Sequence, residues 1–335
     1  MTTKVLITGG SGFIGRKIIE RLSKTKDLEL SCLSRDANKV RGLEAMGVRI
    51  YEGDITKPDS LKHAVQAKDV IIHCAALMSN YDMEGRETFY NVNAKGTKNL
   101  LETCDAAVLK QFIHISTAGV YGPTGTEPVN EEAEYGNVLS SYEWSKKEAE
   151  NVILKYAATR NIPYTILRPS QVYGSGMYYG WTQTMRSIKN GRMLIPGDGR
   201  ARIHLLHIND LVDAVTLVIN NHAAINKIYN ITGPEAVPLR NVFNVIAGIL
   251  GASAPKKIPY MPVYFASLFL GLLPYYMKNE QLKLLTPHRV RFFAGNHVYD
   301  ISKAKRELNF RPSVGLKDGF REMISWSEKT GIFDD

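Results

Sequence analysis

Cysteine is scarce in this chain, and long apolar runs are missing. The three cysteines, Cys32, Cys74 and Cys104, are odd in number and widely spaced, which excludes a disulfide framework or a zinc knuckle and fits a reducing compartment. No stretch reaches the 18 or more apolar residues of a membrane span. The segment 1–7 lacks the basic start, apolar core and cleavage site of a signal peptide. We therefore expect a cytoplasmic protein.

The composition is that of a globular protein. Of the 335 residues, 44% are hydrophobic and 22% are charged, and the net charge is +9. The length suits one large domain or two modest ones. The positive charge permits an anionic partner, such as a cofactor that carries phosphates. Because the basic residues are dispersed and no reader module is present, we expect no nucleic-acid partner.

The first half of the chain alternates short β-branched runs with longer helical patterns, which predicts βαβ units and a parallel sheet. The apolar runs do not alternate with polar residues, as expected when helices cover both faces of a sheet. The predicted strands are Lys4–Thr8, Glu29–Leu33, Arg49–Glu52, Val70–His73, Gln111–Ser116 and Tyr164–Arg168. The predicted helices are Gly15–Lys24, Ser60–Ala64, Ala94–Asp105 and Ser141–Arg160. The segment 233–335 is expected to be mostly helical.

A glycine motif, Gly-x-x-Gly-x-x-Gly, follows the first predicted strand and opens a helix. Gly9 permits a tight turn, Gly12 lets the backbone approach a pyrophosphate, and Gly15 allows the helix to pack closely on the sheet. Phe13 and Ile14 lie inside the motif, where the free N–H groups of a helix start attract phosphates. An ordinary glycine-rich turn is the alternative, but strand, motif and helix in this order favour a dinucleotide site.

The end of the second predicted strand bears on the choice of cofactor. A dinucleotide site that selects NAD carries an acid here, which receives the ribose hydroxyls. This chain has Ser34 and then Arg35, and a guanidinium suits a 2′-phosphate. The sequence therefore favours NADP(H). NAD(H) stays open, with Arg35 as a solvated charge and Asp36 facing the ribose.

Tyr142 and Lys146 are four residues apart in a helical stretch and so share one face. A tyrosine with a pKa near 10 is a poor acid or base at neutral pH, and a nearby ammonium favours the phenolate. We expect Lys146 to lower the pKa of Tyr142 and so prepare it for proton transfer.

The chain resembles the extended short-chain dehydrogenase/reductase (NAD-dependent epimerase/dehydratase) superfamily over nearly its whole length. The motifs that carry the resemblance are Gly9–Gly15, Gly53–Ile55, His73–Ala76, Asn91–Thr97, Tyr142–Lys146, Arg168-Pro169 and Val172–Gly174. The resemblance implies a Rossmann-type α/β fold: a doubly wound parallel sheet with a smaller, mostly helical C-terminal substrate domain. Its dinucleotide-binding domain would cover 1–174, with 203–232 returning to it, and 175–335 would bind substrate.

The resemblance also assigns residues. It implies a catalytic triad of Thr117, Tyr142 and Lys146, with Ser116 as the alternative to Thr117. Beside the glycine motif and residues 34 and 35, the cofactor residues that it implies are Asp54, Ile55, Ala75, Ala76, Leu77, Asn93, Pro169, Tyr142 and Lys146. No metal is expected, because His204 and His207 have no carboxylate or thiol partner at ligand spacing.

Several branches of the superfamily differ from this chain at marker positions. Dehydratases carry Asp-Glu where this chain has Ala118 and Gly119, which disfavours dehydration. Sugar-nucleotide epimerases commonly have Asn and Arg where this chain has Gln171 and Ile203, although Arg200 and Arg202 could compensate for the missing diphosphate contacts. The segments 196–210 and 285–304 look like the 3β-hydroxysteroid dehydrogenase and dihydroflavonol-reductase-like branch.

We therefore expect an oxidoreductase that transfers a hydride between nicotinamide and a secondary alcohol or ketone of a bulky apolar, steroid- or flavonol-like substrate. A UDP-glucose 4-epimerase-like enzyme with tightly held NAD is the alternative, and a nucleotide-binding regulator without activity is a third. The apolar substrate is inferred from aromatic and thioether side chains, namely Met78, Tyr81, Met83, Tyr173, Met177, Tyr178, Tyr179 and Trp181.

One further segment, 263–273, is apolar and lies in a basic neighbourhood. It is too short to span a bilayer. A helix that covers the substrate cleft is the favoured interpretation, and peripheral membrane contact through 258–283 is the alternative. By the resemblance we also expect a homodimer and a small-molecule substrate.

Overall fold

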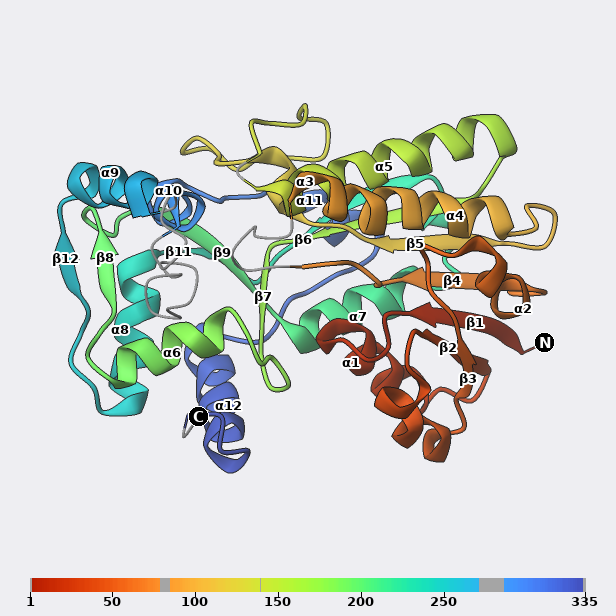
Figure 1. Cartoon of the computed structure of the whole chain (residues 1–335), viewed down its shortest axis with the longest axis horizontal. Coiled ribbons are helices and arrows are strands. Elements are labelled where there is room, and N and C mark those ends of the chain that lie inside the picture. The colour runs from red at the N-terminus through yellow and green to blue at the C-terminus, as the bar shows by residue number, and fades with distance from the viewer. Residues whose placement is uncertain (1, 79–84, 139, 271–285, 334–335) are drawn as a thin grey trace.

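The computed structural model describes residues 2–78, 85–138, 140–270 and 286–333. Its main sheet has seven parallel strands in the order β10-β6-β5-β4-β1-β2-β3 (Figure 1). Their bounds are β1 Thr3–Thr8, β2 Leu28–Ser34, β3 Arg49–Glu52, β4 Val70–His73, β5 Gln111–Ile115, β6 Tyr164–Pro169 and β10 Lys227–Ile231. All six strands predicted for the first half are present, each within one residue of its expected bounds at either end. The predicted α/β fold with a parallel, Rossmann-like sheet is confirmed.

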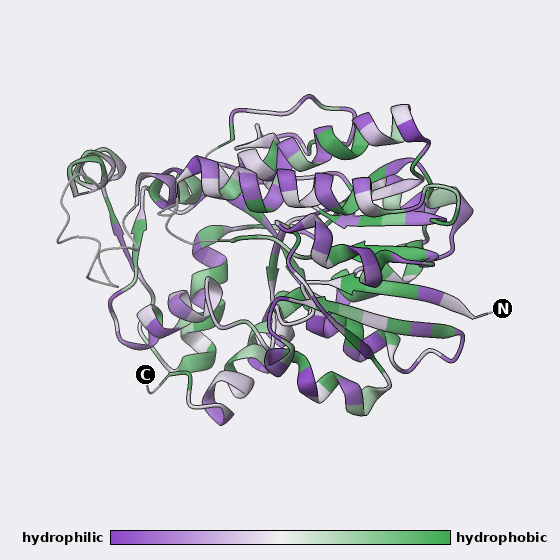
Figure 2. Ribbon diagram, turned by 45° about the vertical axis from the view of Figure 1, so that its right-hand side comes forward, coloured by the Kyte–Doolittle hydropathy of each residue, from purple (hydrophilic) through white to green (hydrophobic). Residues whose placement is uncertain are grey.

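Helices cover both faces of this sheet (Figure 1). Helices α4 (Lys95–Thr103) and α5 (Ser141–Arg160) lie on one face, and α1 (Phe13–Leu22) and α7 (Ile208–Val218) lie on the other. Alternate residues of β1 enter the two separate cores, Val5 and Ile7 on the α1 side and Leu6 on the α4 side. The strands are therefore apolar on both faces, and Figure 2 shows them as hydrophobic between helices of mixed colour.

Short helical segments connect these elements. They are η1 (Ala37–Met46), η2 (Pro58–Leu61), α2 (Lys62–Val65), α3 (Arg86–Phe89), η3 (Tyr90–Ala94), η4 (Ala118–Tyr121) and η5 (His222–Ala224). The helix predicted over 60–64 is shorter than expected, because the preceding turn beginning at Pro58 is a 3-10 helix. Helix α5 has the predicted bounds, and α1 and α4 begin or end within two residues of theirs.

The remaining elements form a second part beside the sheet (Figure 1). A three-stranded sheet has the order β11-β9-β7, and β12 pairs with β8. The strands are β7 Gln171–Tyr173, β8 Leu194–Pro196, β9 Arg202–His207, β11 Ala236–Pro238 and β12 Lys256–Ile258. The helices of this part are α6 Trp181–Lys189, α8 Leu239–Leu250, α9 Tyr260–Leu270, α10 Pro287–Ala294 and α12 Leu316–Lys329. The remaining helix, α11 Ser302–Glu307, packs instead against β10 of the main sheet. The segment 203–232 thus contains nearly all of β9, a strand of this small sheet. It also contains α7, which packs on the main sheet, and β10, a strand of the main sheet.

The second part has its own aromatic core. Tyr173 and Trp181 are buried in it, against Phe320 of α12. The expectation that these two side chains offer apolar surface to a substrate is therefore wrong, because they fill the core instead. Tyr178 and Tyr179 are exposed, as is Met78. Tyr81 and Met83 lie outside the described residues.

Helix α9 contains most of the apolar run 263–273, of which the last residues lie outside the described ranges. Its side chains Met261, Phe265, Leu268 and Phe269 are exposed. Within the described ranges, no helix combines the length and apolar character that crossing a bilayer requires.

Candidate active site

The glycine turn between β1 and α1 has the geometry that the motif predicts. Gly9 adopts a φ of +75°, and a Cβ there would lie 2.7 Å from the backbone nitrogen of Ala75. A Cβ at Gly15 would lie 2.3 Å from the carbonyl oxygen of Gly9, so only glycine allows the helix this close to the strand. Gly12 caps α1 without a side-chain hydrogen bond, which leaves the first N–H groups of the helix available to an anion.

A cavity of about 280 Å³ opens beside this turn, at the carboxyl ends of the strands. The strand order reverses between β1 and β4, and ligands of doubly wound sheets bind at this point. The residues that line the cavity come from the ends of β1, β2, β3 and β4, from the loops after them and from η3. The residues are Thr8, Gly9, Ser11, Gly12, Leu33, Ser34, Arg35, Gly53, Asp54, Ile55, Cys74, Ala75, Ala76, Leu77 and Val92.

Most of the expected cofactor residues thus line one cavity. Phe13, Ile14, Gly15, Asn93 and Pro169 lie outside its lining, as do the expected catalytic residues. Free helix N–H groups, a glycine-rich turn and a cavity at the switch of strand order fit the adenosine and phosphate half of a dinucleotide.

The end of β2 gives each polar side chain a distinct environment. Ser34 is buried, and its hydroxyl donates to the carbonyl oxygen of Asp36 at 2.9 Å. The Asp36 carboxylate caps η1 by accepting from the N–H of Asn38 at 3.0 Å. Arg35 is exposed at the rim of the cavity, whereas Asp36 is not part of the lining. The cation, and not the acid, is therefore the charged group that the end of β2 presents to the cavity.

Asn93 connects the cavity to helix α5. Its Oδ1 accepts from the N–H of Leu77 at 2.7 Å, and its Nδ2 donates to the carbonyl oxygen of Leu77 at 3.0 Å and to Ser145 Oγ at 2.8 Å. These contacts hold the loop after β4 against the first turns of α5. Asn93 thus orders this loop.

Helix α5 carries Tyr142 and Lys146 in its first two turns. A capping box fixes where the helix begins: Ser140 Oγ accepts from the Glu143 N–H at 3.2 Å, and the Glu143 carboxylate accepts from the Ser140 N–H at 3.1 Å. The two side chains lie one turn apart on the same helix, as predicted. Tyr142 is half-buried, and Lys146 is only 2% exposed.

Lys146 points toward the carboxyl end of β5, an interior strand of the main sheet. Its Nζ donates to the carbonyl oxygen of Ile115 at 2.6 Å and lies 3.0 Å from His114 Nε2. Burial lowers the pKa of Lys146 to about 8. Burial, and then the charge of Glu143, raise the pKa of Tyr142 above its usual value. The expected lowering of the pKa of Tyr142 by Lys146 is therefore not what this arrangement produces, because the amine bonds to β5 and an acid adjoins the phenol.

Thr117 and Ser116 have different surroundings at the end of β5. Ser116 is buried, and its hydroxyl donates to the Glu150 carboxylate. Thr117 is half-buried, and its hydroxyl accepts from the N–H of Gly119 at 3.0 Å. Because the hydroxyl of Thr117 keeps its proton to donate, it is better placed than Ser116 to hold a substrate oxygen.

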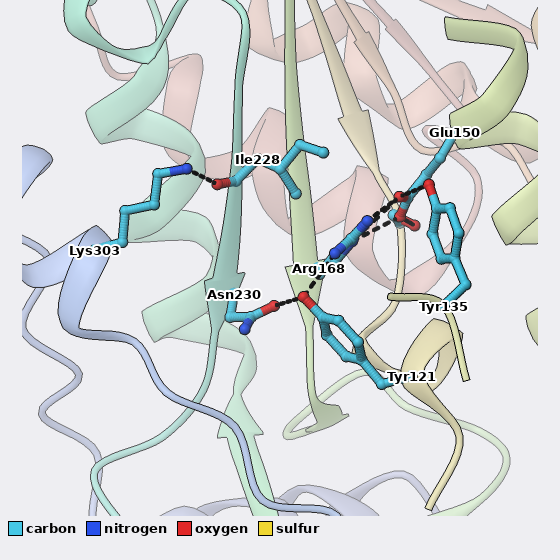
Figure 3. A network of polar contacts seen from close by, with 8 residues as sticks. Tyr121, Tyr135, Glu150, Arg168, Ile228, Asn230 and Lys303 are labelled. Carbon is cyan, nitrogen blue, oxygen red and sulfur yellow. Dashed lines mark hydrogen bonds and ion pairs between the residues drawn. The ribbon is translucent and has the colours of Figure 1, made fainter. Parts of the chain in front are cut away.

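A buried charge network behind this site went unrecognised in the sequence (Figure 3). Arg168 binds both carboxylate oxygens of Glu150, at 2.6 to 3.1 Å, and donates to Tyr121 Oη at 2.6 Å. Tyr135 donates to the same carboxylate, and Tyr121 donates to Asn230 of β10. A signal was present: an arginine near the end of an otherwise apolar strand, and an acid one turn after Lys146 on α5.

Glu143 is a second group that the sequence did not single out. Its side chain is buried, and a Cβ at Gly119 would lie 2.9 Å from Glu143 Oε1. The carboxylate of residue 143 thus occupies the space beside residue 119, where this chain has no side chain of its own. Only the packing of η4 against α5 brings these two positions together.

The residues at the epimerase marker positions lie in or beside the second part. Ile203 is fully buried in its apolar core. The neighbouring Arg202 donates from Nη2 to the carbonyl oxygen of Ala236 at 3.2 Å. His204 and His207 are buried and accept backbone N–H groups, and the described residues hold no group of three or more potential metal ligands.

Known proteins similar to this chain include enzymes of several activities. A 2-alkyl-3-oxoalkanoate reductase of Shewanella oneidensis is 23% identical, over 95% of this chain and 84% of its own. UDP-glucose 4-epimerase of Vibrio cholerae is 28% identical, over 96% and 94%. The 3beta-hydroxysteroid-dehydrogenase/decarboxylase isoform 1 of Arabidopsis thaliana is 27% identical, over 95% and 78%.

Solved structures share the fold. UDP-glucuronic acid 4-epimerase from Bacillus cereus, in complex with UDP-glucuronic acid and NAD, superposes with a TM-score of 0.79 at 24% identity, over 98% of this chain and all of that one. The family described as "NAD dependent epimerase/dehydratase family" matches residues 5–232, more than half of the chain. With this match and the dinucleotide fold, the chain belongs to the NAD-dependent epimerase/dehydratase family of enzymes, in the extended short-chain dehydrogenase/reductase superfamily.

Proposed function

We propose that this enzyme transfers a hydride between the nicotinamide of NADP(H) and a secondary alcohol or ketone of a bulky, largely apolar substrate. The observation that carries the substrate class is the burial of Ile203 in an apolar core. Epimerases that bind nucleoside diphosphates commonly have an arginine at this place, by the resemblance of the motifs. A diphosphate needs several cationic contacts, and this one is missing.

The two neighbouring arginines have other partners in this structure. Arg202 is held by a backbone carbonyl, and Arg200 lies beside Asp198, with 3.5 Å between the charged atoms. The exposed side chains of Met78, Tyr178 and Tyr179 would instead suit an apolar molecule.

The proposed chemistry uses three groups of this chain. The nicotinamide cofactor, when bound, supplies or accepts the hydride. Tyr142 carries its proton at neutral pH, and the phenol would donate this proton to the ketone oxygen as that oxygen gains negative charge from the transferred hydride. The hydroxyl of Thr117 would hold the same oxygen, and Lys146, whose amine bonds to β5, would bind the cofactor ribose.

Mutation of the tyrosine tests this assignment. Tyr142→Phe should reduce kcat by at least about a hundredfold, the usual contribution of a proton-transfer group, and leave cofactor binding nearly unchanged. Tyr156→Phe is the matched control, because Tyr156 lies on the same helix and its hydroxyl bonds to Glu102 at the surface. Retention of most activity by Tyr142→Phe would overturn the proposed chemistry.

A panel of substrates tests the substrate class. Steroid-like ketones, aryl ketones and UDP-hexoses are each incubated with the enzyme and cofactor, and both nicotinamide absorbance and products are followed. A net change of absorbance with an apolar ketone supports the proposal. Interconversion of UDP-hexoses without net change would overturn it in favour of an epimerase, which recycles its cofactor.

The proposed preference for NADP(H) depends on Arg35 at the cavity rim. Hydrogen bonds between charged groups contribute about 1.5–3 kcal/mol, so Arg35→Ala should weaken NADP(H) binding by about 10- to 100-fold and leave NAD(H) binding nearly unchanged. Arg41→Ala, an exposed arginine of η1 outside the lining, is the control. Equal binding of both cofactors by the unmutated enzyme would refute the preference.

A further inference from the structure

His114 is a fully buried histidine in the middle of the main sheet, and the proposed chemistry does not use it. It lies in β5, an otherwise largely apolar strand, and its ring centroid is 5.3 Å from that of His73 in β4. Both ring nitrogens of His73 lie within hydrogen-bonding distance of hydroxyls, those of Thr8 and Thr97. His114 differs, because its Nδ1 has no partner in the described part of the chain and its Nε2 contacts Lys146.

We propose that His114 is a positioning residue for Lys146. Its Nε2 accepts a hydrogen bond from the amine, and this bond, together with the bond to the Ile115 carbonyl, fixes the ammonium at the carboxyl end of β5. The distances are 3.0 Å and 2.6 Å. The inference rests on the role of Lys146 in the proposed function. It adds that a strand residue, outside the Tyr142–Lys146 helix, decides where the amine lies and which protonation state it keeps.

The contact has a defined protonation requirement. An ammonium has three donors and no acceptor, so Nε2 must carry the lone pair and the proton must lie on Nδ1. Burial, with the charge of Lys146, keeps the pKa of His114 well below its usual value, so the ring is neutral and able to accept. A bond from a charged donor to a neutral acceptor favours the charged form of the donor. His114 therefore opposes the loss of charge that burial imposes on Lys146.

The other groups around the amine are few. Glu150, one turn further along α5, favours the ammonium. Burial raises the pKa of Cys74, in the loop after β4, to about 12, so this thiol carries no charge at neutral pH. His73, in β4, has its pKa lowered to about 3 by burial and so carries no charge at neutral pH. Tyr142, one turn earlier on α5, is also uncharged at neutral pH. Of these groups from α5, β4 and β5, His114 and the Ile115 carbonyl make the hydrogen bonds to the amine.

The first test measures the proton affinity of Lys146 in the cofactor-free protein. Lysine labelled with ¹³C is incorporated, the Lys146 resonance is identified by its loss in Lys146→Met, and its shift is followed against pH. The unmutated protein should titrate near pH 8. His114→Phe keeps a ring against His73 but removes the acceptor, and should lower the midpoint by about one pH unit, a tenfold change in the protonation constant. His114→Gln restores an acceptor, so the titration midpoint of Lys146 in this variant should lie close to that of the unmutated protein.

One control and one replacement variant make the result decisive. His204→Leu removes a buried histidine of β9, which belongs to the three-stranded sheet and not to the sheet that contains His114, and should leave the midpoint unchanged. His114→Leu replaces the phenylalanine variant if the latter does not fold. An unchanged midpoint in the apolar variant would overturn the proposal. Equal shifts of the Lys146 midpoint in the apolar variant and in His114→Gln would also overturn it, because they would show that His114 only fills space.

The same variants are then assayed for turnover. If Lys146 acts as a cation, the alkaline limb of the kcat profile should move to lower pH in His114→Phe by the shift seen in the titration, and His114→Gln should restore it. KM for the substrate should change little. The titration needs no turnover, so the two proposals fail separately. An active Tyr142→Phe would refute the proposed function, whereas an unshifted Lys146 would refute the role of His114.

Discussion

The buried pair of Glu150 and Arg168 offers the sharpest stability prediction. Both side chains are almost fully buried, at 0% and 3% exposed, and the guanidinium binds both carboxylate oxygens. Burial opposes the charge of the guanidinium, but the Glu150 carboxylate raises the pKa of Arg168 above its usual value. Glu150→Gln keeps the shape of the side chain and removes the charge. It leaves a buried cation without its counter-ion.

The magnitude follows from that uncompensated charge. Breaking a buried ion pair by removing one partner costs about 3–5 kcal/mol. Glu150 also accepts from Ser116 and Tyr135, which supports the upper part of this range. Since the whole free energy of unfolding of a protein is about 5–15 kcal/mol, the loss would be large. It should appear as a lower urea midpoint, followed by far-UV circular dichroism.

Two further variants decide whether the buried charge is the cause. Arg321→Gln removes an exposed partner of Asp318 and should cost less than about 1 kcal/mol. In the double variant Glu150→Gln/Arg168→Met both charges are gone, so its loss should be smaller than the sum of the single losses by about 1–3 kcal/mol. Strict additivity, or a loss below about 1 kcal/mol in Glu150→Gln, would refute the reasoning.

Three more outcomes follow from the structure. The pKa of Lys146 is about 8 in the folded chain, below its usual 10.5, so the unfolded chain binds more protons between these pH values. The free energy of unfolding should therefore rise by up to about 3 kcal/mol between pH 8 and pH 10.5. Urea unfolding of Lys146→Met should lack this rise, and an equal rise in this variant would contradict the assignment. Thr117→Val should lower kcat with little loss of stability, whereas Ser116→Ala should lower the urea midpoint with a smaller effect on kcat. The reverse pattern would make Ser116 the residue that holds the substrate oxygen and Thr117 the structural one. Gly15→Ala should lower the free energy of unfolding by more than about 2 kcal/mol and weaken cofactor binding, because the added Cβ would clash with backbone atoms. Gly42→Ala is the control, because a Cβ there meets open space, and it should change stability and cofactor binding little. Equal losses in the two variants would rule out the clash as the cause.

Local patterns in the sequence determined the frame of this protein. Apolar runs without alternation predict strands covered on both faces, and β1 has side chains in both cores. The spacing of the glycines predicts a turn that only glycine can make, since the backbone conformation and the lack of a Cβ are properties of single positions. The cap at Ser140 and the four-residue spacing of Tyr142 and Lys146 likewise act within a few residues.

The environment of the site was decided by tertiary structure alone. The amine of Lys146 forms hydrogen bonds with His114 and with the Ile115 carbonyl of β5, and not with Tyr142. The packing of α5 on the sheet decides which atoms of the strand this amine reaches. Whether Ser116 or Thr117 is available depends on Glu150, which is distant in sequence and adjacent in space. Burial and the partners that groups meet across the fold set pKa values and hydrogen bonds, and a pattern of neighbouring residues contains neither.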